Sequence, residues 1–124
     1  MLRILLILFL LCSGTVNAGA QTILLVGDSL SAAYGMPADA GWVALLQRRL
    51  ESEQYPYKLV NASISGDTSA SARARLPDAL DRHRPDIVIL QIGGNDGLRG
   101  LSLTELKQNL ADMIERVTVR GGRC

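Results

Sequence analysis

A serine follows a glycine at the end of an apolar run, an arrangement that could present a nucleophilic hydroxyl. The run Ile23–Val26 has the length and composition of a buried strand, and Gly27-Asp28-Ser29-Leu30 follows it directly. In an α/β fold, a serine on a glycine-bearing turn after a strand stands above the sheet edge. The glycine permits a tight turn, and the backbone N–H groups that follow can point at a developing oxyanion. This pattern predicts an exposed nucleophile at Ser29.

Two further polar clusters stand just past segments that we predict to be strands. Ser65-Gly66-Asp67-Thr68 follows Lys58–Asn61, and Gly93-Gly94-Asn95-Asp96 follows Ile87–Leu90. Because ligands bind outside the carboxyl ends of parallel strands, three loops at this edge describe an active site. Simple turn chemistry is the alternative interpretation of each cluster taken alone.

The elements that would position these loops alternate along the chain. Strands are expected at 23–26, 58–61 and 87–90, and helices at 41–50, 69–82 and 103–117. Pro77 is expected to break or restart the middle helix, and Ser102 with Glu105 indicates a capping box. Apolar strands alternating with helices predict an α/β fold, a flavodoxin-like doubly wound parallel sheet. It is incomplete, with about three strands where five or six are usual, and residues 120–124 match no element.

Composition limits the chain to one domain and gives no sign of a polyanionic partner. The 124 residues carry a formal net charge of +1, and charges of both signs are interspersed. This excludes an electrostatic argument for nucleic acid or for an anionic membrane surface.

The first twenty residues have the three-part plan of a secretory signal peptide. Arg3 precedes the apolar stretch Ile4–Leu11, which is too short to span a bilayer comfortably, and Ala18-Gly19-Ala20 supplies a cleavage pattern. We therefore expect export to the periplasm or beyond, with no stable membrane span after cleavage; a retained anchor is the alternative. Cys12 would leave with the signal, so Cys124 would be unable to form an intramolecular disulfide.

No cofactor or metal is expected. One histidine and two cysteines are too few for a metal cluster. The glycine-rich loops could suggest a phosphate cradle, but they match neither a P-loop nor a dinucleotide fingerprint. The expected partner is therefore a small molecule.

Taken together, the three motifs resemble those of the SGNH (GDSL) hydrolase superfamily. The matching stretches are residues 24–31, 61–69 and 93–100, supported by Trp42 and by Ala74-Arg75-Leu76-Pro77. The likeness runs from Thr22 to about Val117. It implies the SGNH hydrolase fold. It also implies hydrolysis of acyl esters or acyl thioesters (acyl-CoA, lysophospholipid or aryl ester) through an acyl-enzyme.

The resemblance also assigns roles to individual residues. Ser29 matches the nucleophile, and the oxyanion donors are the N–H groups of Ser29 and Gly66 with the side-chain amide of Asn95. Gly66 lacks a Cβ, which lets its backbone approach closely, and an asparagine amide donates without a charge that titrates. Gly27 supports the first turn. Asp28 and Asp96 are expected to hold their loops by accepting hydrogen bonds from backbone N–H groups.

The family's Asp-x-x-His element has no counterpart here. The single histidine, His83, precedes the third predicted strand and is expected at the opposite sheet edge, as a solvated helix-end imidazole. A serine hydroxyl is a weak nucleophile without a base. We therefore expect a C-terminally truncated chain, with residues 1–20 a signal peptide and 21–124 the N-terminal part of an SGNH hydrolase domain.

Two other functions stay open at this point. The chain could be an inactive fragment that self-associates through the open edge of the Ile87–Leu90 strand, or a non-catalytic module that binds a lipid or a carbonyl compound. Met36-Pro37, near the nucleophile, could line an acyl pocket or form a packed loop.

Overall fold

The computed structural model describes residues 19–124, so the predicted signal peptide (residues 1–20) lies almost wholly outside the described residues. The elements are β1 (Gln21–Gly27), the short 3₁₀ turn η1 (Ala38–Ala40), α1 (Trp42–Ser52), β2 (Tyr57–Asn61), α2 (Ser69–His83), β3 (Ile87–Gln91), α3 (Gly94–Leu98) and α4 (Leu103–Val119). The predicted strands and long helices are all present, with bounds that differ by one or two residues at most ends.

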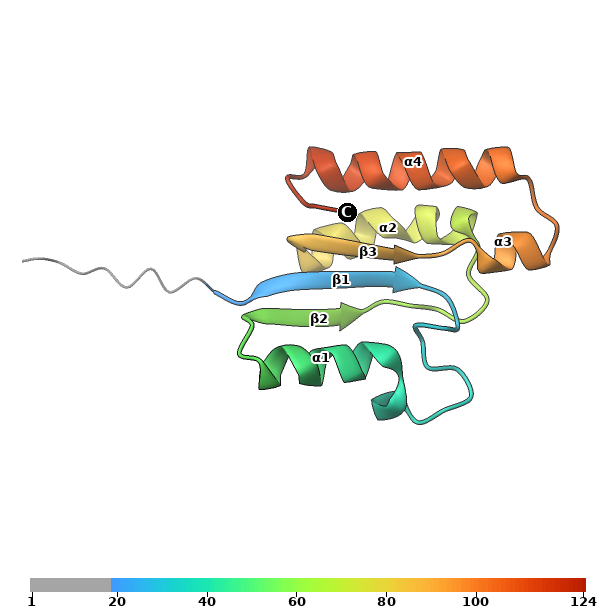
Figure 1. Cartoon of the computed structure of the whole chain (residues 1–124). Coiled ribbons are helices and arrows are strands. Elements are labelled where there is room, and N and C mark those ends of the chain that lie inside the picture. The colour runs from blue at the N-terminus through green and yellow to red at the C-terminus, as the bar shows by residue number, and fades with distance from the viewer. Residues whose placement is uncertain (1–18) are drawn as a thin grey trace, which may run out of the picture.

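The strands form one parallel sheet in the order β2-β1-β3. Leu24 of the central strand pairs with Val60 of β2 and with Val88 of β3. Helix α1 lies on one side of the sheet, and α2 and α4 lie on the other (Figure 1). The carboxyl ends of all three strands point the same way, towards α3. The α/β prediction of a sheet covered on both faces is therefore confirmed.

The core lies between the sheet and the pair α2 and α4. Its fully buried side chains come from β1, α2, β3 and α4: Leu24, Val26, Ala72, Leu76, Leu80, Val88, Met113 and Val117. Burial of a leucine-sized side chain contributes about 1.5–3 kcal/mol. Leu25 points to the other face of β1 by strand alternation and is also fully buried. Because both faces of β1 are buried, its sequence is an unbroken apolar run.

The prediction that Pro77 interrupts the second helix is wrong. Helix α2 runs unbroken from Ser69 to His83 with Pro77 inside it. A proline cannot donate to the carbonyl four residues earlier, which costs about 3 kcal/mol in a helix interior. Leu76 and Leu80, on either side of it, are both buried in the core. Their packing holds the helix together across the missing bond.

One smaller expectation also differs from the structure, and one helix face is incompletely covered. Residues 94–98, expected as a loop, form the short helix α3, which Gly93 opens at φ 118°. The apolar face of α4 is only partly buried, because Met113 and Val117 are in the core while Leu103 and Ile114 remain exposed. Ser102 caps α4, since its Oγ accepts the Glu105 N–H at 3.3 Å. The second hydrogen bond of the expected capping box, from the Ser102 N–H to the Glu105 side chain, is not formed.

The last residues are more ordered than the sequence indicated. Beyond α4, Arg123 pairs with Ile87 of β3 in a parallel bridge. The Val88 N–H donates to the Arg123 carbonyl at 2.7 Å, and the Arg123 N–H donates to the Asp86 carbonyl at 2.9 Å. The tail therefore forms one bridge beside β3, where residues 120–124 were expected to match no element. Within residues 19–124, no helix is both long enough and apolar enough to cross a membrane.

Candidate active site

Ser29 lies on a tight turn directly after β1. The Asp28 carbonyl accepts the Ala32 N–H at 2.9 Å, and the Ser29 carbonyl accepts the Tyr34 N–H at 3.2 Å. Asp28 is 2% exposed, and its Oδ1 accepts the Leu30 N–H at 3.0 Å. The Asp28 carboxylate therefore accepts a hydrogen bond from its own loop, as expected. Ser29 itself is half-buried at the rim of the sheet.

Gly27 is required for a different reason from the one expected. Its φ is not among the positive values, so the turn itself does not need a glycine. A Cβ at this position would lie 2.9 Å from both Gln91 Oε1 and Ser31 Oγ, closer than such atoms approach. The Ser31 hydroxyl donates to Gln91 Oε1 at 2.6 Å and accepts from Trp42 Nε1 at 3.2 Å. These contacts hold the first loop to β3 and α1.

The second loop is bonded to the first. The Ile64 N–H donates to the Gly27 carbonyl at 3.0 Å, and the Asp67 N–H closes a turn onto the Ile64 carbonyl at 3.2 Å. Gly66 has φ 86°, a left-handed conformation that side chains rarely adopt. The Ile64 bond thus holds this loop, with its exposed Gly66, beside the exit of β1.

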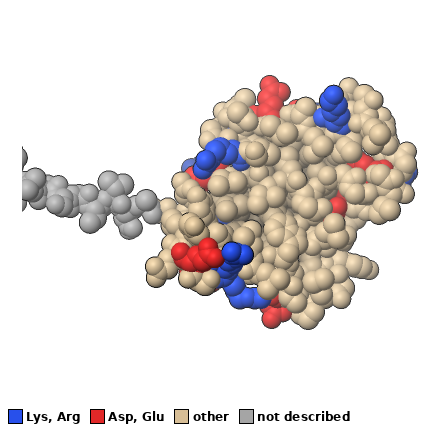
Figure 2. Space-filling view, in the orientation of Figure 1, with Lys and Arg blue, Asp and Glu red and all other residues tan. Residues whose placement is uncertain are grey.

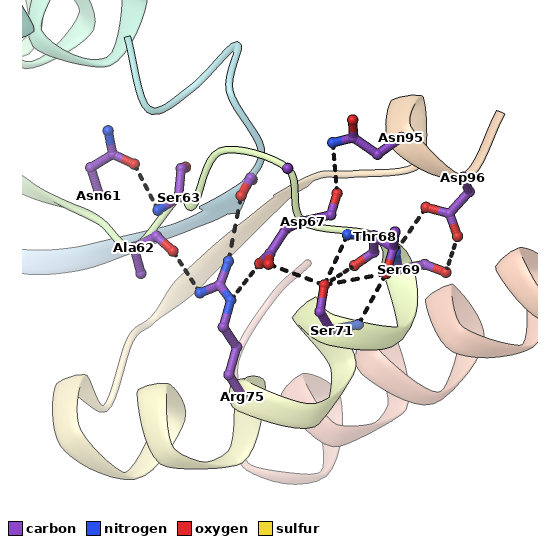
Figure 3. Close-up of polar contacts among 12 residues, drawn as sticks. Asn61, Ala62, Ser63, Asp67, Thr68, Ser69, Ser71, Arg75, Asn95 and Asp96 are labelled. Carbon is purple, nitrogen blue, oxygen red and sulfur yellow. Dashed lines mark hydrogen bonds and ion pairs between the residues drawn. The ribbon is translucent and has the colours of Figure 1, made fainter. Parts of the chain in front are cut away.

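The third loop, which includes α3, is bonded to the second through Asn95. Its side-chain Nδ2 donates to the Asp67 carbonyl at 2.8 Å (Figure 3). An asparagine amide has two N–H bonds, so one anchors the group and the other remains for a ligand. A Cβ at Gly94 would lie 3.5 Å from Asp28 Oδ2, so the third loop also touches the first.

Asp96 joins the third loop to the start of α2. It is 3% exposed; its Oδ2 accepts the Ser69 N–H at 2.8 Å and its Oδ1 accepts the Ser69 hydroxyl at 2.6 Å. Asn109 of α4 donates to the same hydroxyl at 2.9 Å. This is the backbone contact expected of Asp96, extended by two side chains that the sequence did not indicate.

The structure thus brings the three polar motifs into one connected cluster at the carboxyl edge of the sheet. It leaves His83 outside that cluster. His83 is the last residue of α2, at the opposite end from the Thr68 cap that adjoins the second loop. No other histidine occurs in the chain. The cluster therefore contains a hydroxyl and several donors, and within residues 19–124 no imidazole accompanies them.

Sequence reasoning missed Arg75, which is bonded to both the first and second loops. Its spacing in the sequence gave no sign of this, because the acceptors come from separate segments of the chain. Met36-Pro37 lies in the loop before η1, and Met36 is 52% exposed. On the face drawn in Figure 2, cationic and anionic side chains are interspersed among uncharged surface.

The comparison with known families agrees with this geometry. The model of the "GDSL-like Lipase/Acylhydrolase family" matches residues 25–124. The chain belongs to this family. The match spans all three loops and the chain from the second half of β1 onwards.

Individual relatives are similar over most of this chain. Esterase TesA of Pseudomonas aeruginosa is 54% identical over 109 residues, covering 88% of this chain and 54% of that protein. Thioesterase 1/protease 1/lysophospholipase L1 of Escherichia coli K12 is 48% identical over 100 residues, covering 81% of this chain and 47% of that protein. The chain therefore spans about half the length of these curated relatives.

Solved structures share the fold. A crystal structure of TesA aligns with a TM-score of 0.81 and 55% identity, covering 82% of this chain and 57% of that one. The psychrotrophic esterase EstA from Pseudoalteromonas sp., in a structure inhibited by monoethylphosphonate, aligns with a TM-score of 0.80 and 42% identity, covering 82% and 56%. The fold is that of SGNH hydrolases, with a sheet of three strands in the part of the chain that the structure describes.

Proposed function

We propose that residues 21–124 form the N-terminal part of a serine hydrolase domain that cleaves acyl esters or acyl thioesters. Ser29 is the nucleophile, and the Ser29 N–H, the Gly66 N–H and the Asn95 amide hold the oxyanion. The observation that carries the proposal is the Asn95 amide, which is bonded to the second loop at 2.8 Å with one N–H left over. The names of the relatives support the same chemistry: an esterase, an arylesterase and a thioesterase/lysophospholipase.

The reaction follows from the arrangement of these groups. The Ser29 oxygen bonds to the substrate carbonyl carbon, and the carbonyl oxygen becomes an oxyanion that the three donors stabilise. The Ser29 proton passes to solvent water, because no imidazole accompanies the hydroxyl within residues 19–124. The bond to the leaving oxygen or sulfur then breaks, and the leaving group takes up a proton. Water attacks the acyl-enzyme, releases the acid and restores the hydroxyl. Preorganised donors supply much of the acceleration in such sites.

A second candidate function is a non-catalytic fragment that binds carbonyl compounds or lipids and self-associates. The position of His83 at the far end of α2 favours it, because a hydroxyl without a base reacts slowly. The outer edge of β3 supports self-association. Within residues 19–124, this edge pairs only through the bridge at Arg123, and an open strand edge attracts other chains.

One labelling experiment separates the two functions. The purified chain is incubated with a fluorophosphonate probe and with p-nitrophenyl butyrate, beside Ser29→Ala and the matched control Ser52→Ala. Ser52 is an exposed serine at the end of α1. A hydrolase gives labelling and turnover in the wild type and in Ser52→Ala, with loss of both in Ser29→Ala. Equal reaction of all three variants, or none in any, contradicts the hydrolase; lipid binding without labelling supports the second candidate.

We further propose that residues 1–20 direct export and that the mature chain begins at Gln21. The basic start, the short apolar stretch and the Ala18-Gly19-Ala20 pattern support this. N-terminal sequencing of the chain recovered from a periplasmic extract tests it. A chain that retains Met1 in the membrane fraction contradicts it.

A further inference from the structure

Arg75 of α2 is bonded to three separate segments at the carboxyl edge of the sheet. Its Nε donates to Asp67 Oδ2 at 2.6 Å, its Nη1 to the Ala62 carbonyl at 2.6 Å, and its Nη2 to the Gly27 carbonyl at 3.4 Å (Figure 3). These acceptors belong to the second loop, to the exit of β2 and to the end of β1. A guanidinium suits this task because its five donors are held in a rigid plane.

The acceptor Asp67 lies between two of the proposed oxyanion donors. It follows Gly66 in the chain, and its own carbonyl accepts the Asn95 Nδ2 at 2.8 Å. Its carboxylate is fixed on both sides, because Oδ1 accepts the Ser71 hydroxyl at 3.0 Å while Oδ2 accepts from Arg75. The side chain of Asp67 therefore locks the backbone on which both donors depend.

The Arg75–Asp67 pair also differs from the other ion pairs among residues 19–124. Its side chains are 22% and 10% exposed, whereas the remaining pairs, such as Arg73–Asp112 at 46% and 31%, lie more openly on the surface. A buried carboxylate that loses its cation is left without compensation. Removal of Arg75 would leave Asp67 in that state and would also take a donor from two backbone carbonyls.

We infer that Arg75 is a positioning residue: through Asp67 and the Gly27 carbonyl, it holds the Gly66 N–H and the Asn95 amide in register with Ser29. This inference rests on the proposed hydrolase function. Arg75 does not touch the reacting atoms in this account. It acts by setting where the donors stand, and a displacement of such groups by about 1 Å can cost roughly 10²-fold in rate.

The test compares Arg75→Met, which keeps the length and removes the charge, with Arg75→Lys and with the matched control Arg73→Met. Arg73 lies two residues away on the same helix, and within residues 19–124 its guanidinium is bonded only to surface Asp112. For p-nitrophenyl butyrate, kcat of Arg75→Met is expected to fall about 10- to 100-fold with KM within about twofold, since the donors that Arg75 positions act in the transition state. The kcat of Arg75→Lys is expected to lie between those of Arg75→Met and the wild type. The kcat of Arg73→Met is expected to match that of the wild type.

Chemical rescue separates positioning from loss of fold. In Arg75→Ala, added methylguanidinium is expected to restore much of the rate of Ser29 phosphonylation, while the same cation leaves the wild-type rate unchanged. A loss of rate that follows the unfolded fraction measured by circular dichroism, with no rescue, overturns the inference. So does a wild-type rate in folded Arg75→Met. If Arg75→Met does not fold, the kcat of Arg75→Lys provides the same test, and it is expected to be lower than that of the wild type.

A spectroscopic readout keeps this inference separate from the proposed function. In ¹H–¹⁵N spectra, the Gly66 backbone signal and the Asn95 side-chain signals are expected to shift in Arg75→Met and to stay in place in Arg73→Met. If the wild type shows no Ser29-dependent labelling, the proposed hydrolase function is contradicted. The signals of Gly66 and Asn95 still show whether Arg75 determines the positions of these two groups. Unshifted signals in a folded Arg75 variant overturn the inference whatever the activity.

Discussion

The two edges of the parallel sheet are held together by different kinds of contact. Every buried polar or charged residue of the described chain lies at the carboxyl edge: Asp28, Ser31, Asp67, Thr68, Ser69 and Asp96. At the amino edge several polar contacts are exposed, such as the Thr22 N–H on Asp86 Oδ2 at 2.8 Å and the surface pair of Arg120 with Asp81. A buried polar group left unpaired costs about 1–3 kcal/mol, so a bonded cluster of six marks an edge under functional constraint.

Helix starts explain part of this difference. In a parallel α/β sheet the carboxyl edge receives the beginnings of the helices, whose first N–H groups lack partners within the helix. Thr68 caps α2 with its side chain, and Asp96 accepts the Ser69 N–H. The same side chains that satisfy the helix start also join one loop to the next. The amino edge receives the carboxyl ends of the helices. Helix α2 ends there at Arg84, which has a left-handed conformation.

The largest contrast between the edges is expected in the chemical step. Asn95→Ala removes one proposed oxyanion donor at the carboxyl edge, and the rate of Ser29 phosphonylation should fall about 10²–10³-fold, or about 2.7–4 kcal/mol of barrier. His83→Gln, at the far end of α2, should leave that rate unchanged. The release of p-nitrophenol from a phosphonate ester measures both. An equal loss of rate in His83→Gln would contradict the distinction between the two edges and would identify His83 as the base.

Stability should show the same contrast with a smaller magnitude. Asp96→Asn weakens two hydrogen bonds to a buried carboxylate, and the free energy of unfolding should fall by about 1.5–3 kcal/mol. Asp86→Asn is the matched change at the amino edge, where an amide oxygen can still accept the Thr22 N–H in an exposed setting, so a change within about 0.5 kcal/mol is expected. Urea unfolding of both variants provides the comparison. A larger loss in Asp86→Asn than in Asp96→Asn would contradict it.

The sequence predicted the fold well where one physical rule dominates. The doubly buried run of β1, the cap at Ser102 and the alternation of strands with helices each follow from local pattern. Pro77 was misjudged because its local rule competes with the packing of Leu76 and Leu80, which only the assembled core reveals. The bridge at Arg123 was missed for a similar reason, since a short polar tail becomes part of a sheet only beside an existing strand.

The candidate site divides in the same way. The motifs around Ser29, Gly66 and Asn95 could be found because glycine and small polar residues cluster after each strand. Their contacts could not, because hydrogen bonds such as Asn95 to the Asp67 carbonyl join residues 28 positions apart. Arg75 shows the limit most clearly, since its Gly27 acceptor is 48 positions away. The reason for Gly27 itself, the close approach of Ser31 and Gln91, also needed the tertiary structure.

The smallest effect is expected away from both edges, on the surface between α2 and α4. There the guanidinium groups of Arg116 and Arg73 donate to Asp112 at 2.7 Å each and hold the pKa of that carboxyl below its usual value. A carboxyl whose pKa is depressed by folding stabilises the native state above its unfolded pKa. That contribution disappears as the pH falls through the folded pKa.

The wild type should therefore be slightly more stable than Asp112→Asn at neutral pH, and the two should converge as the pH falls below 3.8, the usual pKa of this carboxyl. Because the group is solvent-exposed, salt should weaken the difference as well. Urea midpoints of the two proteins, measured across this pH range at low and high salt, test the expectation. A gap that persists in acid would mean that Asp112 stabilises the helix pair by packing, and the surface pairs would then resemble the buried cluster more closely than their exposure indicates.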